Sequence, residues 1–343
     1  MINRFAQRAR PVARLRQAAP LVALLGATTP LWAATLQVGP GQPFATPSAA
    51  ARAAHDGDTV HIAAGTYFDC AIWHANDLTI EGDAAATTVL TDTACAGKAL
   101  VIIDGRNTTI RHLTLARARV PDNNGAGIRS EAPDLTVADV RFINDQDGIL
   151  SGADGGFLRI SGASFLDDGA APDGVPTHAV IAGHLDSLRI EGSRFAQARG
   201  GDDIVSAAIT TELVGNHLAD SGGNMAGPLV QVAGGSLLLA GNEVTLGPGA
   251  AARPGVVLLT GDAVALTVRG NTLSGGTVPL VRNWGAVSAV AEGNIMPPGI
   301  PAVSDQGSSY HRLRASLARL RDQARHTAGA ARHALAVLVR GVL

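Results

Sequence analysis

The feature that most constrains this chain is a short unit that recurs six times between residues 135 and 275. Each copy has alternating apolar residues, then Gly or another small residue, then often Asn or Ser, and then a further apolar residue. Alternation at period two is typical of β-strands. Six copies are LTVADVRFIN (135–144), LRISGASFLD (158–167), LRIEGSRFAQ (188–197), TELVGNHLAD (211–220), LLLAGNEVTL (237–246) and LTVRGNTLSG (266–275).

Four asparagines show the length of the repeat. Asn216, Asn242, Asn271 and Asn294 follow one another at steps of 26, 29 and 23 residues. Such a period is typical of stacked repeat architectures, whose units run from about 20 to 50 residues. Asn tolerates left-handed backbone geometry and bonds to neighbouring backbone groups. We therefore expect a β-solenoid in which these side chains form a structural ladder, with a ligand site made of them as the alternative.

A second apolar strand recurs between these copies, so one coil contains at least two strands. Examples are AGIRS (126–130), DGILS (147–151), HAVIAG (178–183) and DDIVSA (202–207). Stacking pairs each strand in parallel with its equivalents in the coils above and below, and it buries the apolar faces that one repeat cannot bury alone. Aromatic residues make up only 3% of the 343 residues. The core must therefore consist mainly of Val, Ile, Leu and Ala.

The two ends of such a stack need caps. Residues 46–56 predict a short helix, with Thr46 as N-cap, Pro47 in the first turn and Gly57 as the stop. The N-terminal cap would span 40–70. Residues 297–309 read as a linker, and 310–343 predict a basic amphipathic helix with an apolar stripe at helical spacing. This C-terminal helix either covers the solenoid or lies on an anionic membrane surface.

The N-terminus predicts an export signal over residues 1–33. Five Arg and no acidic residue precede the apolar stretch APLVALLGATTPLWAA, and cleavage would follow Ala33. The alternative is an anchored N-terminal helix, but the apolar run is shorter than the ~20 residues that span a bilayer. We expect a periplasmic or secreted protein of a Gram-negative envelope.

Removing both termini exposes an acidic body. Of 27 basic and 29 acidic residues, residues 1–33 hold 5 basic, and residues 310–343 hold 7 basic and 1 acidic. Residues 34–309 therefore keep 15 basic and 28 acidic residues, a net charge of −13. This charge argues against nucleic acid as a partner. It also argues against tight binding of a polyanionic sugar unless a cation mediates it.

The chain has two cysteines, Cys70 and Cys95. In an oxidising compartment such a pair often closes a disulfide. Their separation of 25 residues is about one coil, so the bond would staple the first coils to the N-terminal cap. Two buried thiols are the alternative.

The segment DGDTVHIAAGTY (56–67) and the coil pattern over about 40–296 resemble the pectin-lyase-like superfamily of right-handed parallel β-helices. CAGKALVI, LTLARARVPDNNGAGIRSE, DLTVADVRFINDQDGILSG and GHLDSLRIEGSRF are similar to a group of exported bacterial β-helix repeat proteins. The resemblance implies an all-β, right-handed parallel β-helix over 34–296, and chemistry on acidic polysaccharides by lyases, hydrolases or epimerases. The superfamily also includes binding and adhesion proteins, so the fold does not settle the activity.

Elimination from a uronic acid sugar needs a base, a cation beside the carboxylate, and an acid for the leaving oxygen. If Ile128, Ile149, Val180 and Ile204 point inward, then Arg129, Leu150, Ile181 and Val205 point outward, which is a poor cleft for a charged sugar. In the similar bacterial group the stretch equivalent to 201–207 reads Gly-His-His-x-Lys-Ser-Arg. In this chain it reads GDDIVSA, so the resemblance carries no catalytic residues over to this stretch.

Some acid–base candidates remain. Asp202 or Asp203 could act with Asp147 of the coil two below, at a separation of ~9–10 Å. His178 of the intervening coil is a further acid–base candidate, with a structural histidine as the alternative. No resident cofactor is expected. A Ca²⁺ site built from Asp145, Asp147, Asp202 and Asp203 is an alternative, although Ca²⁺ prefers six to eight oxygen ligands.

Substrate-binding candidates are Arg129, Arg282 and Trp284. Arg129 could instead form a solvated pair with Glu131, and Trp284 could pack against a cap. We expect an exported, monomeric, carbohydrate-handling protein, a degenerate relative of a polysaccharide lyase that binds glycan or serves as an envelope scaffold. The alternatives are an active lyase or hydrolase and an envelope assembly protein.

Overall fold

The computed structural model describes residues 33–169, 177–220, 227–247, 250–251, 253–285 and 287–305. They all belong to one compact unit. The predicted signal, apart from Ala33, and the predicted C-terminal helix over 310–343 lie outside the described residues. Within the described part of the chain, no helix is long and apolar enough to cross a membrane.

Three parallel sheets form this unit. Sheet A contains, in chain order, β1 (Thr35–Val38), β2 (Thr59–Ile62), β5 (Thr79–Gly82), β8 (Thr108–Arg111), β11 (Leu135–Ala138), β14 (Phe157–Ser161), β17 (Ser187–Glu191), β20 (Thr210–Val214), β23 (Gly235–Ala240), β26 (Ala263–Arg269) and β29 (Ala289–Glu292). Sheet B contains β3 (Gly65–Tyr67), β6 (Thr88–Thr91), β9 (Thr114–Ala116), β12 (Arg141–Ile143), β15 (Ser164–Leu166), β18 (Arg194–Ala196), β21 (His217–Ala219), β24 (Glu243–Thr245) and β27 (Thr272–Ser274). Sheet C contains β4 (Ala71–Trp73), β7 (Ala99–Ile103), β10 (Ala126–Ser130), β13 (Asp147–Ser151), β16 (Val180–Ala182), β19 (Ile204–Ser206), β22 (Val230–Val232), β25 (Val257–Leu259), β28 (Val281–Asn283) and β30 (Val303–Asp305).

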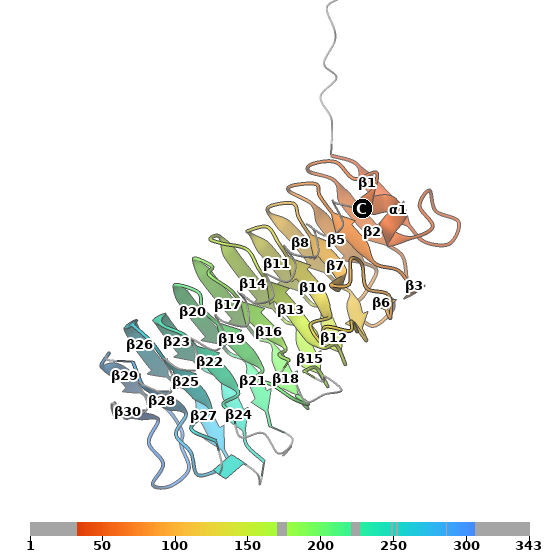
Figure 1. Ribbon diagram of the computed structural model, residues 1–343. Coiled ribbons are helices and arrows are strands. Elements are labelled where there is room, and N and C mark those ends of the chain that lie inside the picture. The colour runs from red at the N-terminus through yellow and green to blue at the C-terminus, as the bar shows by residue number, and fades with distance from the viewer. Residues whose placement is uncertain are drawn as a thin grey trace, which may run out of the picture. The chain divides into compact units, whose positions relative to one another are not determined.

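Each complete coil, from β2 to β28, contributes one strand to each sheet, as β11, β12 and β13 do in turn. All strand pairs within the three sheets are parallel, and each strand pairs with its equivalents in the adjacent coils. Figure 1 shows the coils stacked from the α1 end to β30. The predicted parallel β-helix is thus confirmed, and each repeat copy such as 135–144 holds two strands separated by a sharp turn.

That turn, between sheets A and B, explains the Gly-Asn element of the repeat. Gly215 and Gly241 adopt φ values of +62° and +63°, which a residue without a Cβ adopts most easily. The next residue, Asn216 or Asn242, points into the interior and is buried. The Asn242 Oδ1 accepts the Asn216 backbone N–H at 2.9 Å, and the Asn242 Nδ2 donates to the Leu213 carbonyl at 2.8 Å. Equivalent bonds continue through Asn271 to Asn294, so the predicted ladder is confirmed as a structural one.

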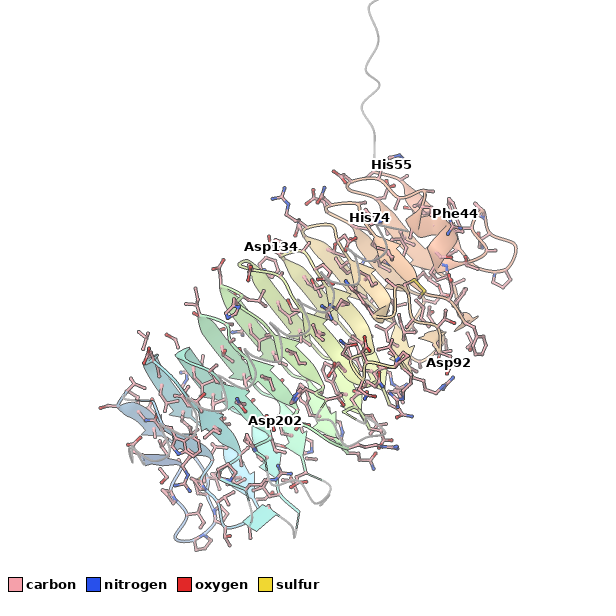
Figure 2. All side chains as sticks on the ribbon, viewed as in Figure 1. Phe44, His55, His74, Asp92, Asp134 and Asp202 are labelled. Atoms are coloured by element: carbon pink, nitrogen blue, oxygen red, sulfur yellow. A yellow bond between two sulfur atoms is a disulfide. The ribbon has the colours of Figure 1, made fainter. Side chains whose placement is uncertain are left out.

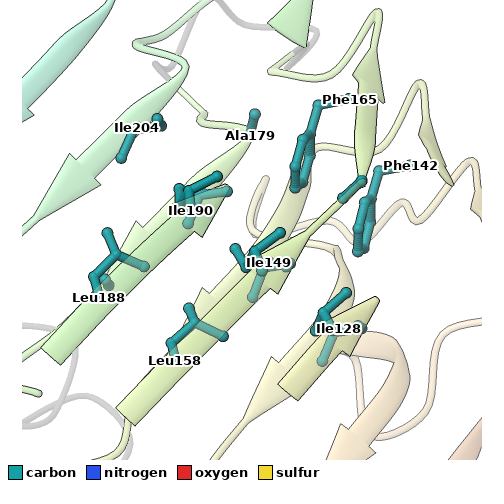
Figure 3. Close-up of a cluster of buried hydrophobic side chains, with 14 of the residues drawn as sticks. Ile128, Phe142, Ile149, Leu158, Phe165, Ala179, Leu188, Ile190 and Ile204 are labelled. Atoms are coloured by element: carbon teal, nitrogen blue, oxygen red, sulfur yellow. The ribbon is translucent and has the colours of Figure 1, made fainter. Parts of the chain in front are cut away.

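The interior of the solenoid is packed with aliphatic side chains and one aromatic column. Phe142, Phe165 and Phe195 occupy equivalent positions of sheet B and stack with ring centroids 4.6 and 4.7 Å apart. Figure 3 shows two of these rings beside the inward side chains of sheets A and C, such as Leu188 and Ile149. Three of the few aromatic side chains of the chain therefore form one column that runs through three adjacent coils of the core.

A short helix, α1 (Pro47–Ala51), packs beside β1 and β4 at the N-terminal end of the stack. The Thr46 Oγ1 accepts the backbone N–H of Ala49 at 3.3 Å, as the N-cap prediction requires. The helix ends five residues earlier than the predicted boundary at residue 56. Near this end, a disulfide joins Cys70 to Cys95, the pair considered from the sequence.

Candidate functional site

The outer face of sheet C carries one continuous row of outward side chains, which we call the sheet C row. Each residue of the row is the register partner of the next one on the adjacent strand. They are Ile72, Ile102, Arg129, Leu150, Ile181, Val205, Gln231, Leu258, Arg282 and Ser304. The predicted inward residues of the same strands, such as Ile128 and Ile204, are fully buried. The sequence-based assignment of inward and outward positions in these strands is therefore correct.

Arg129 belongs to a charged cluster at one part of this row. Its Nε donates to the Glu131 Oε1 at 3.1 Å, and the Lys98 Nζ lies 2.8 Å from the same oxygen. Partial burial raises the pKa of Glu131, but the hydrogen bond from Lys98 and the charge of Arg129 lower it below its usual value overall. Arg129 and Glu131 form the ion pair that the sequence offered as the alternative to substrate binding by Arg129, but both side chains are partly buried. Lys98, the only lysine of the chain, joins them.

Asp147, His178 and Asp202 follow one another across adjacent coils at the start of sheet C strands. The Asp147 Oδ1 accepts the backbone N–H of His178 at 2.7 Å. The His178 Nδ1 lies 3.0 Å from the Asp202 backbone nitrogen and 3.3 Å from the Asp202 carbonyl oxygen, so it accepts from the first or donates to the second according to the tautomer of the imidazole. The structure therefore brings three sequence-predicted catalytic candidates into one connected line. Figure 2 labels Asp202 on the coil that contains β19.

Both carboxyls of this line favour the protonated form more than usual. Burial raises the pKa of Asp147 to about 7, against the opposing effects of the His178 backbone and the Arg129 charge. Burial also raises the pKa of Asp202 to about 7, with Arg253 opposing the shift. Asp147 is only 2% exposed, whereas Asp202 is half-buried. Asp202 is therefore the carboxyl of this line that a substrate reaches more easily.

The Asp203 side chain points to the inner face of sheet C, so it does not form a solvent-exposed carboxylate pair with Asp202. It occupies the position of Ala179 and Leu229 in the adjacent coils, and both of those side chains belong to the core. Asp203 is 3% exposed, and its Oδ2 has no hydrogen-bond partner in the described structure. Because the Asp203 carboxyl faces the interior, we do not expect it to contact a substrate on the outer face of sheet C.

The alternative Ca²⁺ site is not assembled. Asp145 lies in the turn between β12 and β13, is fully buried, and accepts the Ala118 backbone N–H at 2.7 Å. Asp203 faces the interior instead of the line of Asp147 and Asp202. Among the described residues, no three His, Cys, Asp or Glu side chains are grouped so that they could hold a metal ion.

Arg282 and Trp284 lie far from Arg129. β28, which contains Arg282, is followed in sheet C by β30, so it is not the terminal strand of this sheet. The Arg282 Nε donates to the Pro254 carbonyl at 2.8 Å, and its Nη1 lies 3.0 Å from the Ser304 Oγ. Six strand spacings separate the two arginines, about 29 Å at the usual spacing. They could contact a long chain together, but not one sugar ring.

Sequence reasoning missed a buried ion pair near Asp202. The Arg253 Nη2 lies 3.0 Å from the Asp220 Oδ2, and both side chains are almost fully buried. The two residues are 33 positions apart; Asp220 ends the repeat copy 211–220, but Arg253 lies outside the six repeat copies. No local sequence signal connects them. The charge of Arg253 opposes the rise in the pKa of Asp202 and Asp203, and the charge of Asp220 adds to the rise in the pKa of Asp203.

No protein-family model and no curated protein matches the sequence. Solved structures do match. The alginate lyase from Paenibacillus sp. str. FPU-7 has a TM-score of 0.59 and 16% identity over 79% of this chain and 98% of that chain. The chain has the parallel β-helix fold of that protein. The PL6 family alginate lyase AlyGC has a TM-score of 0.56 and 17% identity over 77% of this chain, but only 40% of that chain. At these identities the likeness shows the fold alone.

Proposed function

We propose that this protein binds a polysaccharide along the outer face of sheet C and does not cleave it by β-elimination. The solved structures that share its fold are described as alginate lyases, which supports a carbohydrate ligand. The predicted export signal supports a ligand in the periplasm or outside the cell. The observation that carries the proposal is the composition of the sheet C row.

The row offers an extended binding surface, but it holds no side chain suited to act as the base of a β-elimination. Its charged members are Arg129 and Arg282, and an arginine does not release its proton at neutral pH to act as a base. Between them lie mainly aliphatic side chains, which can pack against the C–H faces of sugar rings. The guanidinium groups, Gln231 and Ser304 can bond to hydroxyls. Ligand sites commonly combine an apolar lining with a few polar groups in this way.

One observation favours a second candidate function, the hydrolysis of a glycan. Asp202 is a half-buried carboxyl whose pKa is raised to about 7 by burial, beside the imidazole of His178. A group with a pKa near the working pH is suited to transfer protons in either direction. In this candidate function Asp202 is the general acid or base.

Incubation with a panel of neutral and acidic polysaccharides tests both functions. Affinity electrophoresis measures binding, absorbance of unsaturated uronates detects elimination, and a reducing-end assay detects hydrolysis. We expect binding without product, weakened about tenfold by Arg129→Ala or Arg282→Ala through the loss of charged hydrogen bonds. Arg159→Ala, on the exposed face of sheet A, is the matched control and should bind normally.

Three outcomes would contradict the proposal. If no polysaccharide of the panel binds, the binding function fails. If a product forms and Asp202→Asn abolishes it while Arg159→Ala does not, hydrolysis through Asp202 replaces simple binding. Production of unsaturated uronates would show that elimination takes place despite the composition of the row.

A further inference from the structure

We propose that the C-terminal segment 310–343 docks as an amphipathic helix along the sheet C row and covers its apolar middle. The inference does not depend on glycan binding. If the proposed function also holds, the segment and the glycan share one surface and compete for it.

The middle of the row is an apolar surface outside the main core. Leu150, Ile181 and Val205 are only partly buried, although they lie on consecutive strands of one sheet. At the N-terminal part of the same face, Ile72 and Leu150 pack on a second apolar cluster of Ala99, Ile102 and Ala126, which is separate from the interior. A partly exposed aliphatic strip of this kind gains free energy when an apolar partner covers it.

The path of the chain brings the segment to one end of this strip. β30 is the terminal strand of sheet C, and it contains Asp305, the last described residue. Only four residues, 306–309, separate it from the start of the segment at Tyr310. Docking would therefore begin at the β30 end of the row, and no long linker would have to be ordered.

The segment also has the length and pattern to follow the row. Its apolar stripe consists of Leu313, Leu317, Leu320, Ala324, Ala331, Leu335 and Leu338. From Leu313 to Leu338 a helix rises about 38 Å. From Ser304 on β30 to Ile102 on β7 there are eight strand spacings, also about 38 Å. One helix running back from β30 would thus cover the row almost to the disulfide end.

Charge favours the same arrangement. The segment carries seven arginines and one aspartate, whereas residues 34–309 have a net charge of −13. Beside the row, Glu131 is already bonded to Arg129 and Lys98, so the attraction comes from the net charge of the body as a whole. Arginines that flank the apolar stripe would therefore meet an acidic body, which would steer and hold the helix.

Trypsin tests the docking, because each arginine of the segment is a potential cleavage point. Full-length protein is digested, and release of the segment is followed by mass spectrometry. Ile181→Glu on the row and Leu317→Glu on the segment should each speed this cleavage about tenfold, since cleavage follows the population of the undocked form. Leu238→Glu, at a similarly half-buried outward position of sheet A, should leave the rate unchanged.

Equal cleavage rates in all four proteins would overturn the proposal. So would protection that disappears on dilution, which indicates a second copy as the partner, or protection that requires phosphatidylglycerol vesicles, which indicates a membrane surface. If Ile181→Glu fails to fold, cysteine pairs replace it. Val205→Cys should cross-link within one chain to Leu320→Cys or Ala324→Cys, and Leu238→Cys should not. Absence of the Val205 cross-link with both partners would contradict the docking.

Discussion

Asp203 shows how a single residue can make the stability of this solenoid depend on pH. Burial, and then the charge of Asp202, raise its pKa to about 7, while Arg253 opposes the shift. An unfolded aspartate titrates near 3.9. Because the folded state holds its proton more tightly, the stabilising contribution is complete below about pH 4 and is lost as pH rises through about 7.

We therefore predict that Asp203→Asn reduces the loss of stability between about pH 4 and pH 7. For one group the free energy of unfolding changes by up to about 1.4 kcal/mol per pH unit in this window, and the amide removes that contribution. Urea unfolding at a series of pH values measures it. Asp154→Asn, at a highly exposed position, is the control. Parallel pH profiles for Asp203→Asn and the parent protein would refute the assignment.

The same residue marks a limit of sequence interpretation. Alternation correctly placed Ile204 inside and Val205 outside, but strict alternation would also put Asp203 outside and Asp202 inside. Instead, two consecutive residues point inward where several strands of sheet C begin, as Ala179 and Val180 or Leu229 and Val230 do. A break in alternation of this kind depends on how the preceding turn enters the sheet. The sequence pattern therefore could not separate the roles of the two aspartates.

At the scale of the repeated elements, the asparagine ladder ties each turn to the next. Asn242 in the middle of the ladder accepts from Asn216 and donates to the Leu213 carbonyl and to Asn271. Removing its side chain leaves several buried backbone and amide groups without partners. Each such group costs about 1–3 kcal/mol.

We predict that Asn242→Ala lowers the free energy of unfolding by about 3 kcal/mol or more. Asn294→Ala should cost less, because Asn294 is the last described member of the ladder and is half-buried, so water can replace part of its bonding. Urea unfolding followed by circular dichroism compares the two variants. Equal losses would mean that the ladder does not act through burial of its bonds.

The elements themselves were predictable to different degrees. The parallel solenoid and the ladder could be predicted from the repeat. The turn between sheets A and B needs a residue with left-handed geometry followed by a buried amide, and this requirement appears in the sequence as a recurring Gly-Asn pair. The helix after Thr46 was predicted, but its predicted end at residue 56 was too late. The alanines after Ala51 favour a helix by propensity alone, whereas the helix of the structure stops at Ala51, where it packs beside β1 and β4. The ion pair of Asp220 and Arg253 had no signature, because it joins two turns of different coils.

At the scale of the whole molecule, net negative charge sets how ionic strength acts on a glycan ligand: it is −13 over residues 34–309, and −7 over residues 34–343, which have 22 basic and 29 acidic residues. An acidic polysaccharide that approaches the sheet C row is repelled by the body as a whole, while Arg129 and Arg282 attract it only locally. Raising the ionic strength from 0.01 to 0.1 M shortens the screening length from about 30 to about 10 Å, which weakens the long-range repulsion more than contact pairs.

We therefore predict that affinity for an acidic polysaccharide rises over this salt range, whereas affinity for a neutral one stays constant. Affinity electrophoresis or calorimetry with one ligand of each kind at both ionic strengths measures the difference. Arg129→Ala with Arg282→Ala should bind the acidic ligand more weakly but keep the same upward trend, since the body charge remains. A steep fall in acidic-ligand affinity with salt would show instead that contact with the two arginines outweighs the field of the body.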